Sequence, residues 1–291
     1  MRYRSPEEDS GRWEGFPFRD GDIVISTRSK HGTTWMQMIC ALLVFRSPEL
    51  PAPLSELSPW FDWLVEPRPD VLARLEAQRH RRFIKTHTPL DGLPLDRRAT
   101  YVVVARHPLD AAVSLYYQGD NLDRRRLRDL TGQPGRASTQ GRAPVRDWLV
   151  GWIERNADAQ DDLDSLPGVL WHVSDAWARR AEPNVVLVHY HDLSTGLESV
   201  IGDLAGRLGV TVDDEAWPEL VEAARFEHMR SRAAELVPDT LGVLKDLSQF
   251  FRQGTSGAGR ELLTENEYAR YLARTAELAP ANLLRWLQRP E

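Results

Sequence analysis

The chain has 291 residues, a length that suits one large domain and allows a sizeable hydrophobic core. Its formal net charge of −6 argues against wholesale nucleic-acid binding, and its single cysteine, Cys40, excludes an intramolecular disulfide and fits a reducing compartment. No apolar run approaches the ~18 residues needed to cross a bilayer, and the charged N-terminal segment lacks the apolar stretch of a signal peptide. We therefore expect a cytoplasmic protein without a transmembrane segment, and leave open both contact with a membrane surface and a homodimer.

Short β-branched runs alternate along the chain with amphipathic stretches. Strands are expected at residues 22–27, 82–85, 100–105 and 185–189. Helices are expected at residues 33–45, from residue 108 onward, and at residues 171–180, 197–208, 217–234 and 265–278. This order predicts an α/β fold: a single domain over residues 1–291 with a mainly parallel central sheet flanked by helices. Residues 119–146 have many arginines and glycines and little periodicity, which predicts a mobile loop.

Only three of the basic residues are lysines, and two of them, Lys30 and Lys85, belong to segments where a predicted strand ends. In a parallel sheet, ligands bind beyond the carboxyl ends of the strands. Lysine carries a compact ammonium group on a flexible stem, whereas arginine carries a broad planar fork. We therefore expect both positions to need a small, mobile cation beside an anionic group.

The segment from Lys30 to Trp35, with the sequence KHGTTW, joins the first predicted strand to the first predicted helix. A tight loop of this kind exposes backbone N–H groups at a helix N-terminus and forms an anion site. The spacing differs from that of a Walker A loop, G-x-x-x-x-G-K-[ST]. The alternative is an ordinary helix start with threonine at its cap.

Three further segments are candidates for the same site. His87, beside Lys85, could act as a general base whose pKa the neighbouring cation lowers, or could be a structural histidine. Arg106 and Ser114 could bind one phosphate group, although Arg106 could instead pair with Asp110. The glycine-rich residues 250–260 permit close approach of the backbone to a ligand, or form a flexible surface loop.

Taken together and in this order, the four segments resemble the cytosolic-type sulfotransferases, which use 3'-phosphoadenosine 5'-phosphosulfate (PAPS) as sulfuryl donor. The resemblance extends from about Asp20 to Leu278. Residues 81–93 and the sequence Ser58-Pro59-Trp60 are similar to the actinobacterial branch, which includes mycobacterial glycolipid sulfotransferases. The resemblance implies a P-loop-kinase-like sulfotransferase fold, PAPS as cosubstrate, adenosine 3',5'-bisphosphate (PAP) as product, and no metal.

The resemblance also implies roles for individual residues. His87 is the expected catalytic base, and Lys30 and Lys85 are the expected catalytic cations. The expected contacts to the 5'-phosphosulfate are Lys30, His31, Gly32, Thr33 and Thr34. The expected contacts to the adenine are Trp35, Tyr190 and Phe226. The expected contacts to the 3'-phosphate are Arg106, Ser114, Arg252, Gln253 and Gly254.

Several residues depart from the family pattern. Ser29 and His31 stand where proline and serine are usual, and Gln253 replaces a lysine. Gly259 stands where a tryptophan is usual, which predicts a looser loop. Ala224 and Arg225 replace small hydroxyl residues that usually precede Phe226, which weakens the adenine role expected there.

The sequence therefore predicts in-line transfer of a sulfuryl group from PAPS to the hydroxyl of a small-molecule or glycolipid acceptor. The acceptor pocket is expected to include residues 60–63, the aromatic residues Trp13, Phe16 and Phe18, and residues 119–146. Two alternatives stay open. One is a nucleotide or small-molecule kinase, which would need Mg²⁺ and ATP. The other is a catalytically inactive adenine-nucleotide binder of the same fold.

Overall fold

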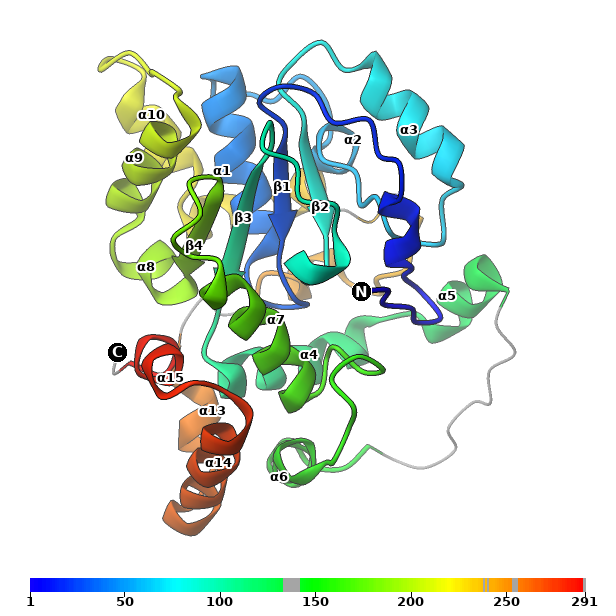
Figure 1. Ribbon diagram of the computed structural model, residues 1–291, viewed down its shortest axis with the longest axis vertical. Coiled ribbons are helices and arrows are strands. Elements are labelled where there is room, and N and C mark those ends of the chain that lie inside the picture. The colour runs from blue at the N-terminus through cyan, green and yellow to red at the C-terminus, as the bar shows by residue number, and fades with distance from the viewer. Residues whose placement is uncertain (133–141, 238, 240, 253–255, 290–291) are drawn as a thin grey trace.

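The computed structural model describes residues 1–132, 142–237, 239, 241–252 and 256–289. At its centre lies a four-stranded parallel sheet in the order β2-β1-β3-β4 (Figure 1). The strands are Ile23–Ser26 (β1), Phe83–Thr86 (β2), Thr100–Ala105 (β3) and Val185–His189 (β4). The predicted parallel sheet is confirmed, and each strand lies within one residue of its expected bounds.

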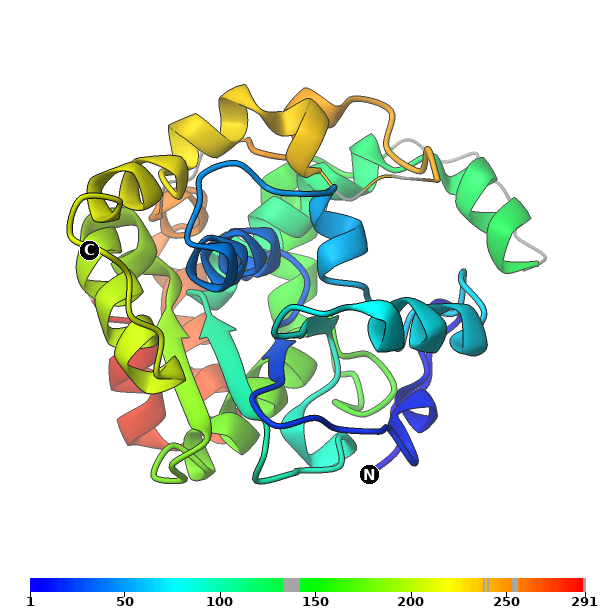
Figure 2. The same cartoon turned by 90° about the horizontal axis from the view of Figure 1, so that it is seen from above.

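Both faces of the sheet are covered, as its β-branched strands require. On one face, Ile23 and Ile25 pack against helix α1 (Thr33–Phe45). On the other face, Val24 packs with aromatic residues of the N-terminal segment and with helix α3 (Arg68–Ala77). Figures 1 and 2 show these layers from two directions.

The remaining helices complete the two layers. The C-terminal helices form a further cluster that packs beyond the end of β3. The α-helices are Leu54–Leu57 (α2), Pro108–Asn121 (α4), Arg124–Thr131 (α5), Val145–Glu154 (α6), Leu166–Ala178 (α7), Tyr190–Thr195 (α8), Leu197–Leu208 (α9), Trp217–Ala223 (α10), Phe226–Ser231 (α11), Ala233–Leu236 (α12), Ala258–Glu261 (α13), Glu265–Leu278 (α14) and Ala281–Leu287 (α15). The 3₁₀ helices are Ser10–Trp13, Leu90–Gly92 and Leu247–Gln249. None of the helices in the described part of the chain combines the length and apolarity that crossing a membrane requires.

The helices expected at 33–45, 197–208 and 265–278 are confirmed. The helix expected at 217–234 is wrong in extent, because it is broken into α10, α11 and α12. The first break lies at Ala224 and Arg225, where Arg225 adopts an extended backbone with ψ 140°. The break leaves the carbonyl of Ala224 available to the indole Nε1 of Trp35, which donates to it at 2.8 Å.

Two further expectations need correction. Helix α7 starts at Leu166, earlier than expected, because the hydroxyl of Ser165 accepts from the N–H of Gly168 and caps the first turn. Residues 119–146 are not a single loop: they include the end of α4, all of α5 and the start of α6. The side chain of Asp123 caps α5, a helix start that the run of arginines conceals in the sequence. Residues 133–141 of this segment lie outside the described residues.

Candidate active site

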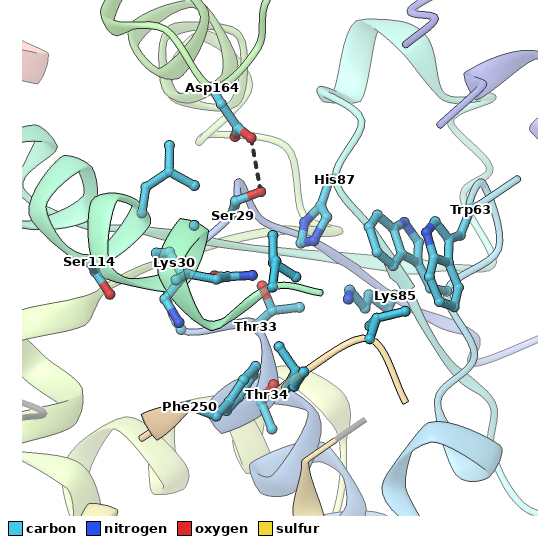
Figure 3. A pocket seen from close by; sticks show the side chains of 18 of the residues that line it. Ser29, Lys30, Thr33, Thr34, Trp63, Lys85, His87, Ser114, Asp164 and Phe250 are labelled. Atoms are coloured by element: carbon cyan, nitrogen blue, oxygen red, sulfur yellow. Dashed lines mark hydrogen bonds between the residues drawn. The ribbon is translucent and has the colours of Figure 1, made fainter. Parts of the chain in front are cut away.

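A cavity of about 470 Å³ lies beyond the carboxyl ends of the strands (Figure 3). Each strand brings residues to it: Lys30 follows β1, Lys85 and His87 stand at the end of β2, Arg106 follows β3 and Tyr190 follows β4. This is the edge at which parallel sheets bind ligands. The fold therefore brings together segments that are far apart in the sequence.

The loop between β1 and α1 forms the floor of the cavity. Lys30 adopts a left-handed backbone with φ 67°, and Gly32, with φ 98°, precedes the first residue of α1. A Cβ atom at Gly32 would lie 3.0 Å from the ring of Tyr190. The position therefore favours glycine for two reasons, its positive φ and the nearby ring. Thr33 and Thr34 open the helix, and both line the cavity. The first N–H groups of α1 have no helical acceptor and suit an anion.

The ammonium group of Lys30 is buried at the cavity wall, 4.7 Å from the centroid of the Phe250 ring. Burial, followed by repulsion from Arg106 and Arg252, lowers the pKa of Lys30 to about 7. Such a lysine gains an electrostatic partner only when an anion enters. The position is therefore suited to an anionic group that binds and leaves.

The imidazole of His87 is held in one orientation. Its Nδ1 is hydrogen-bonded to the backbone carbonyl of Thr27, so Nδ1 carries the proton and Nε2 is left as the basic nitrogen. Burial, followed by the charges of Lys85 and Arg28, lowers the pKa of His87 well below its ordinary value. The ring is therefore neutral at physiological pH and can accept a proton, which the general-base hypothesis requires.

A group of arginine and hydroxyl side chains lines the cavity on the side of α4. Arg106 donates through a terminal guanidinium nitrogen to the carbonyl of Lys30 at 3.2 Å, and its guanidinium lies 4.1 Å from the centroid of the Tyr190 ring. Ser114 of α4 and Arg252 also line the cavity. Two guanidinium groups and a hydroxyl suit a phosphate group.

Gly259 belongs to α13 and packs closely on α4. The expectation of a looser loop stays a prediction, because residues 253–255 lie outside the described residues. Asp110 of α4 accepts hydrogen bonds from the N–H groups of Gly257 at 2.9 Å and Gly259 at 2.8 Å. A Cβ atom at Gly259 would lie 2.5 Å from backbone and side-chain atoms of Leu109. The close approach of α13 to α4 therefore favours glycine at position 259.

Three aromatic rings form the wall beneath α11. The rings of Tyr190 and Phe226 each lie with their centroids 5.6 Å from that of Trp35. The indole of Trp35 is fixed by its bond to the carbonyl of Ala224. This arrangement offers flat apolar surfaces that suit an aromatic base, and replacement of the usual hydroxyl residue by Ala224 leaves the backbone contact intact.

Most of the residues that the sequence predicts for the site line this single cavity. They are Lys30, Gly32, Thr33, Thr34, Trp35, Lys85, His87, Arg106, Ser114, Tyr190, Phe226 and Arg252. His31 differs, because its side chain is buried beside the carbonyl of Ser29, at 3.0 Å from Nδ1, and is not part of the lining. Burial lowers the pKa of His31 to about 4, so its side chain brings no charge to the site at neutral pH. Gln253 and Gly254 lie outside the described residues.

The expected acceptor residues divide into two groups. Trp60 and Trp63 line the cavity, as do five residues of the segment 119–146: Gly119, Leu122, Arg124, Leu127 and Arg142. The expectation was wrong for the N-terminal aromatic residues. Trp13, Phe16 and Phe18 are buried in the core beneath the sheet and pack around Phe61 and Val24. Their burial stabilises the N-terminal segment.

Sequence reasoning missed Arg28, which connects several segments around the cavity. It donates to the carboxylate of Asp164 at 2.6 Å and to the backbone carbonyl of His87, and lies 3.7 Å from the carboxylate of Glu8. The Arg28 side chain is 3% exposed and that of Asp164 is 38% exposed, so the ion pair joins a buried guanidinium to a partly exposed carboxylate. The place of Arg28 two residues before Lys30 was the only signal, because Glu8 and Asp164 belong to other segments of the sequence.

Within the described residues, no group of three or more histidine, cysteine, aspartate or glutamate side chains is placed to hold a metal ion. The cations that line the cavity are lysine and arginine side chains. With the amides of α1 they form a site for a molecule that carries at least two anionic groups, next to a neutral histidine.

Comparison with known proteins identifies the family of the chain. The model of the sulfotransferase domain family matches residues 20–279. A glycolipid sulfotransferase from Mycobacterium bovis (strain BCG / Pasteur) is 41% identical over 303 residues, which cover 98% of this chain and 93% of that protein. A structure of retinol dehydratase in complex with androsterone and the inactive cofactor PAP has a TM-score of 0.71 at 20% identity, covering 97% of this chain and 85% of the other. A mouse sulfotransferase, SULT7A1, complexed with PAP has a TM-score of 0.67 at 20% identity, covering 96% and 92%.

The chain belongs to the sulfotransferase family, and its fold is the sulfotransferase fold. It is an enzyme that uses PAPS as sulfuryl donor, and its sequence is similar to the mycobacterial glycolipid sulfotransferases, as the sequence motifs predict. The comparisons do not favour the kinase or the inactive nucleotide binder.

Proposed function

We propose that the protein transfers the sulfuryl group of PAPS to a hydroxyl group of a glycolipid, with His87 as the general base. The proposal depends most on the orientation of His87, whose Nδ1 is bonded to the carbonyl of Thr27. A neutral imidazole held in this way presents Nε2 to a cavity that also contains Lys30 and Lys85. Burial lowers the pKa of His172 in the same way, but His172 does not line the cavity, so it is the place of His87 in the cavity wall that favours a catalytic role.

The proposed reaction is a single in-line displacement. Nε2 of His87 takes the proton of the acceptor hydroxyl while the acceptor oxygen forms a bond to sulfur. The bond between sulfur and the bridging oxygen of the phosphosulfate breaks, and the negative charge moves to that oxygen. Lys30 and the N-terminal amides of α1 stabilise this charge, and Lys85 stabilises the sulfuryl oxygens. PAP and the sulfate ester of the acceptor are the products.

The donor would occupy the part of the cavity near α1, α4 and α11. Its 3'-phosphate would lie against Arg106, Ser114 and Arg252, and its adenine against Trp35 and its neighbouring rings. Gln253 and Gly254 retain their predicted contribution to the 3'-phosphate site. A contact of the His31 side chain with the phosphosulfate also stays a prediction. The backbone N–H of His31 donates to the carbonyl of Arg28.

The rest of the cavity lining suits an amphiphilic acceptor. Carboxyl and indole side chains lie on the side of the N-terminal segment, and they are Glu7, Glu8, Trp60, Trp63 and Asp164. Carboxylates accept hydrogen bonds from sugar hydroxyl groups. Apolar side chains lie on the side of α5 and of the segment that precedes Phe250, and they are Leu115, Leu122, Leu127, Val243 and Leu244. The similarity to a mycobacterial glycolipid sulfotransferase supports a glycolipid acceptor. A cytoplasmic location, contact with a membrane surface and a homodimer stay predictions from the sequence.

The donor site can be tested by calorimetry with PAP. Wild-type protein is expected to bind PAP without metal, and Arg106→Ala is expected to weaken binding by ~10–100-fold, because a charge-assisted contact to a phosphate is lost. Arg97→Ala removes the same charge from an exposed position far from the cavity and is expected to leave the affinity unchanged. Preference for ATP with Mg²⁺ over PAP would contradict the proposal and favour a kinase.

Binding of PAP is expected to be linked to proton uptake. In the free protein the pKa of Lys30 is about 7, and a bound phosphate raises it by adding a nearby negative charge. The affinity for PAP is therefore highest below pH 7. It falls as the pH rises above 7, by up to ~10-fold for each pH unit, because Lys30 must gain a proton when PAP binds. Calorimetry at pH 8 in two buffers of different ionisation enthalpy measures this uptake. Absence of uptake in wild type would show that Lys30 does not face the bound phosphate.

A further inference from the structure

The cationic groups that line the donor part of the cavity all lie on aromatic rings. The four pairs are Lys30 with Phe250 at 4.7 Å, Lys85 with Trp60 at 3.8 Å, Arg106 with Tyr190 at 4.1 Å, and Arg252 with Tyr117 at 4.2 Å, measured to the ring centroid. The negative face of an aromatic ring attracts a cation that lies within about 6 Å of the ring centroid.

The two lysines differ from the buried arginines that hold the fold together. Arg82 and Arg28 form ion pairs with Asp22 and Asp164. Within the described residues, neither Lys30 nor Lys85 has a carboxylate oxygen within 4.0 Å, although Glu8 and Asp62 act on Lys85 from farther away. A carboxylate in direct contact would cancel the charge that the substrate needs, whereas the negative face of an aromatic ring attracts a cation without adding a full opposite charge.

The contact between Lys85 and Trp60 is set by backbone register. Residues 59–61 lie alongside β2, and Trp60 forms a parallel bridge with Lys85. The N–H of Lys85 donates to the carbonyl of Pro59 at 3.0 Å, and the N–H of Phe61 donates to the carbonyl of Lys85 at 3.1 Å. Paired residues in adjacent strands direct their side chains to the same face. The lysine stem and the indole are therefore aligned by hydrogen bonds on both sides.

The indole of Trp60 is itself held in place. Trp63 stacks on it with a centroid distance of 5.2 Å and an interplanar angle of 5°. The ring of His87 meets Trp60 edge to face, with centroids 4.6 Å apart. Figure 3 shows the indole of Trp63 on the same side of the cavity as the ammonium group of Lys85. One indole thus contacts both the proposed base and the proposed cation.

We propose that Trp60 is a positioning residue that holds the ammonium group of Lys85 at the sulfuryl group and leaves its charge available to the transition state. This rests on the proposed function, in which Lys85 acts on the sulfuryl oxygens. It goes beyond that function, because Trp60 acts through Lys85 and needs no bond to the donor. The simpler view, that Trp60 only forms a wall of the acceptor site, predicts a change in acceptor KM instead.

Replacement of Trp60 by leucine, and by phenylalanine as the conservative variant, separates these views. Trp60→Leu is expected to lower kcat at saturating acceptor by ~5–30-fold, the range that a desolvated cation–π contact supports. Trp60→Phe keeps an aromatic face and is expected to stay within ~3-fold of wild type. Trp171→Leu removes a half-exposed indole on α7, outside the cavity, and serves as the matched control.

A double-mutant cycle with Lys85→Met tests whether Trp60 acts through Lys85. If it does, Trp60→Leu causes no further loss of kcat once the ammonium group is absent. Additive losses would overturn the proposal, and so would a Trp60→Phe variant as slow as Trp60→Leu. PAP binding by each variant shows that it is folded, and Trp60→Met replaces Trp60→Leu if the leucine variant does not bind. Lack of turnover in wild type would instead count against the proposed function.

Discussion

His87→Ala is expected to lower kcat by ~10²–10⁴-fold, the usual contribution of a general base, while PAP affinity stays close to that of wild type. The two effects are expected to be separable, because His87 is bonded to the carbonyl of Thr27, whereas the proposed phosphate contacts come from other segments. Steady-state turnover with PAPS and calorimetry with PAP measure them independently.

Two controls support this experiment. His80→Ala removes an imidazole that packs on Phe45, far from the cavity, and is expected to leave kcat unchanged. Added imidazole is expected to restore part of the activity of His87→Ala, because the lost side chain leaves space beside the acceptor hydroxyl. A His87→Ala enzyme with near wild-type kcat would show that another group removes the proton.

Lys30→Arg is expected to lower kcat by ~10²-fold, although the charge is kept, because loss of one well-placed donor to a developing negative charge costs about this much. The ammonium group of Lys30 is buried beside Phe250, on a residue with φ 67°. A guanidinium group is broader and planar, and cannot follow the charge to the bridging oxygen in the same way. PAP affinity is expected to change by less than kcat does.

The third lysine of the chain provides a matched control. Lys245 is exposed, and its ammonium group donates to the carbonyl of Asp120 at 2.7 Å. Lys245→Arg is expected to retain full activity, since a surface hydrogen bond of this kind can also be made by arginine. A fully active Lys30→Arg enzyme would contradict the idea that the site needs a compact cation.

The sequence predicted the parts of the molecule in which local pattern and tertiary environment agree. The runs around Ile25 and Val102 are apolar on both faces, and such runs form buried parallel strands. The loop of Lys30 and Gly32 follows one of these strands, so its place at the sheet edge was predictable. The order of the four motifs then indicated the family. The resemblance to that family implied roles for individual residues that no single motif could have indicated.

Other features depend on contacts between distant segments. The break at Ala224 is compensated by the indole of Trp35, and no local pattern in residues 217–234 indicates it. Arg28 is connected to Glu8 and Asp164 across most of the chain. The packing of Gly259 on Leu109 could not be predicted either, because it depends on the close approach of two distant segments.

The central claim is tested most directly by turnover with radiolabelled PAPS and a neutral glycosyl lipid, with a chelator present. The account predicts a sulfated lipid and an equal amount of PAP, with loss of both in His87→Ala. Tight PAP binding by a wild-type enzyme that transfers no sulfuryl group to any hydroxyl acceptor would contradict it. Transfer of phosphate from ATP that requires Mg²⁺ would contradict it more strongly.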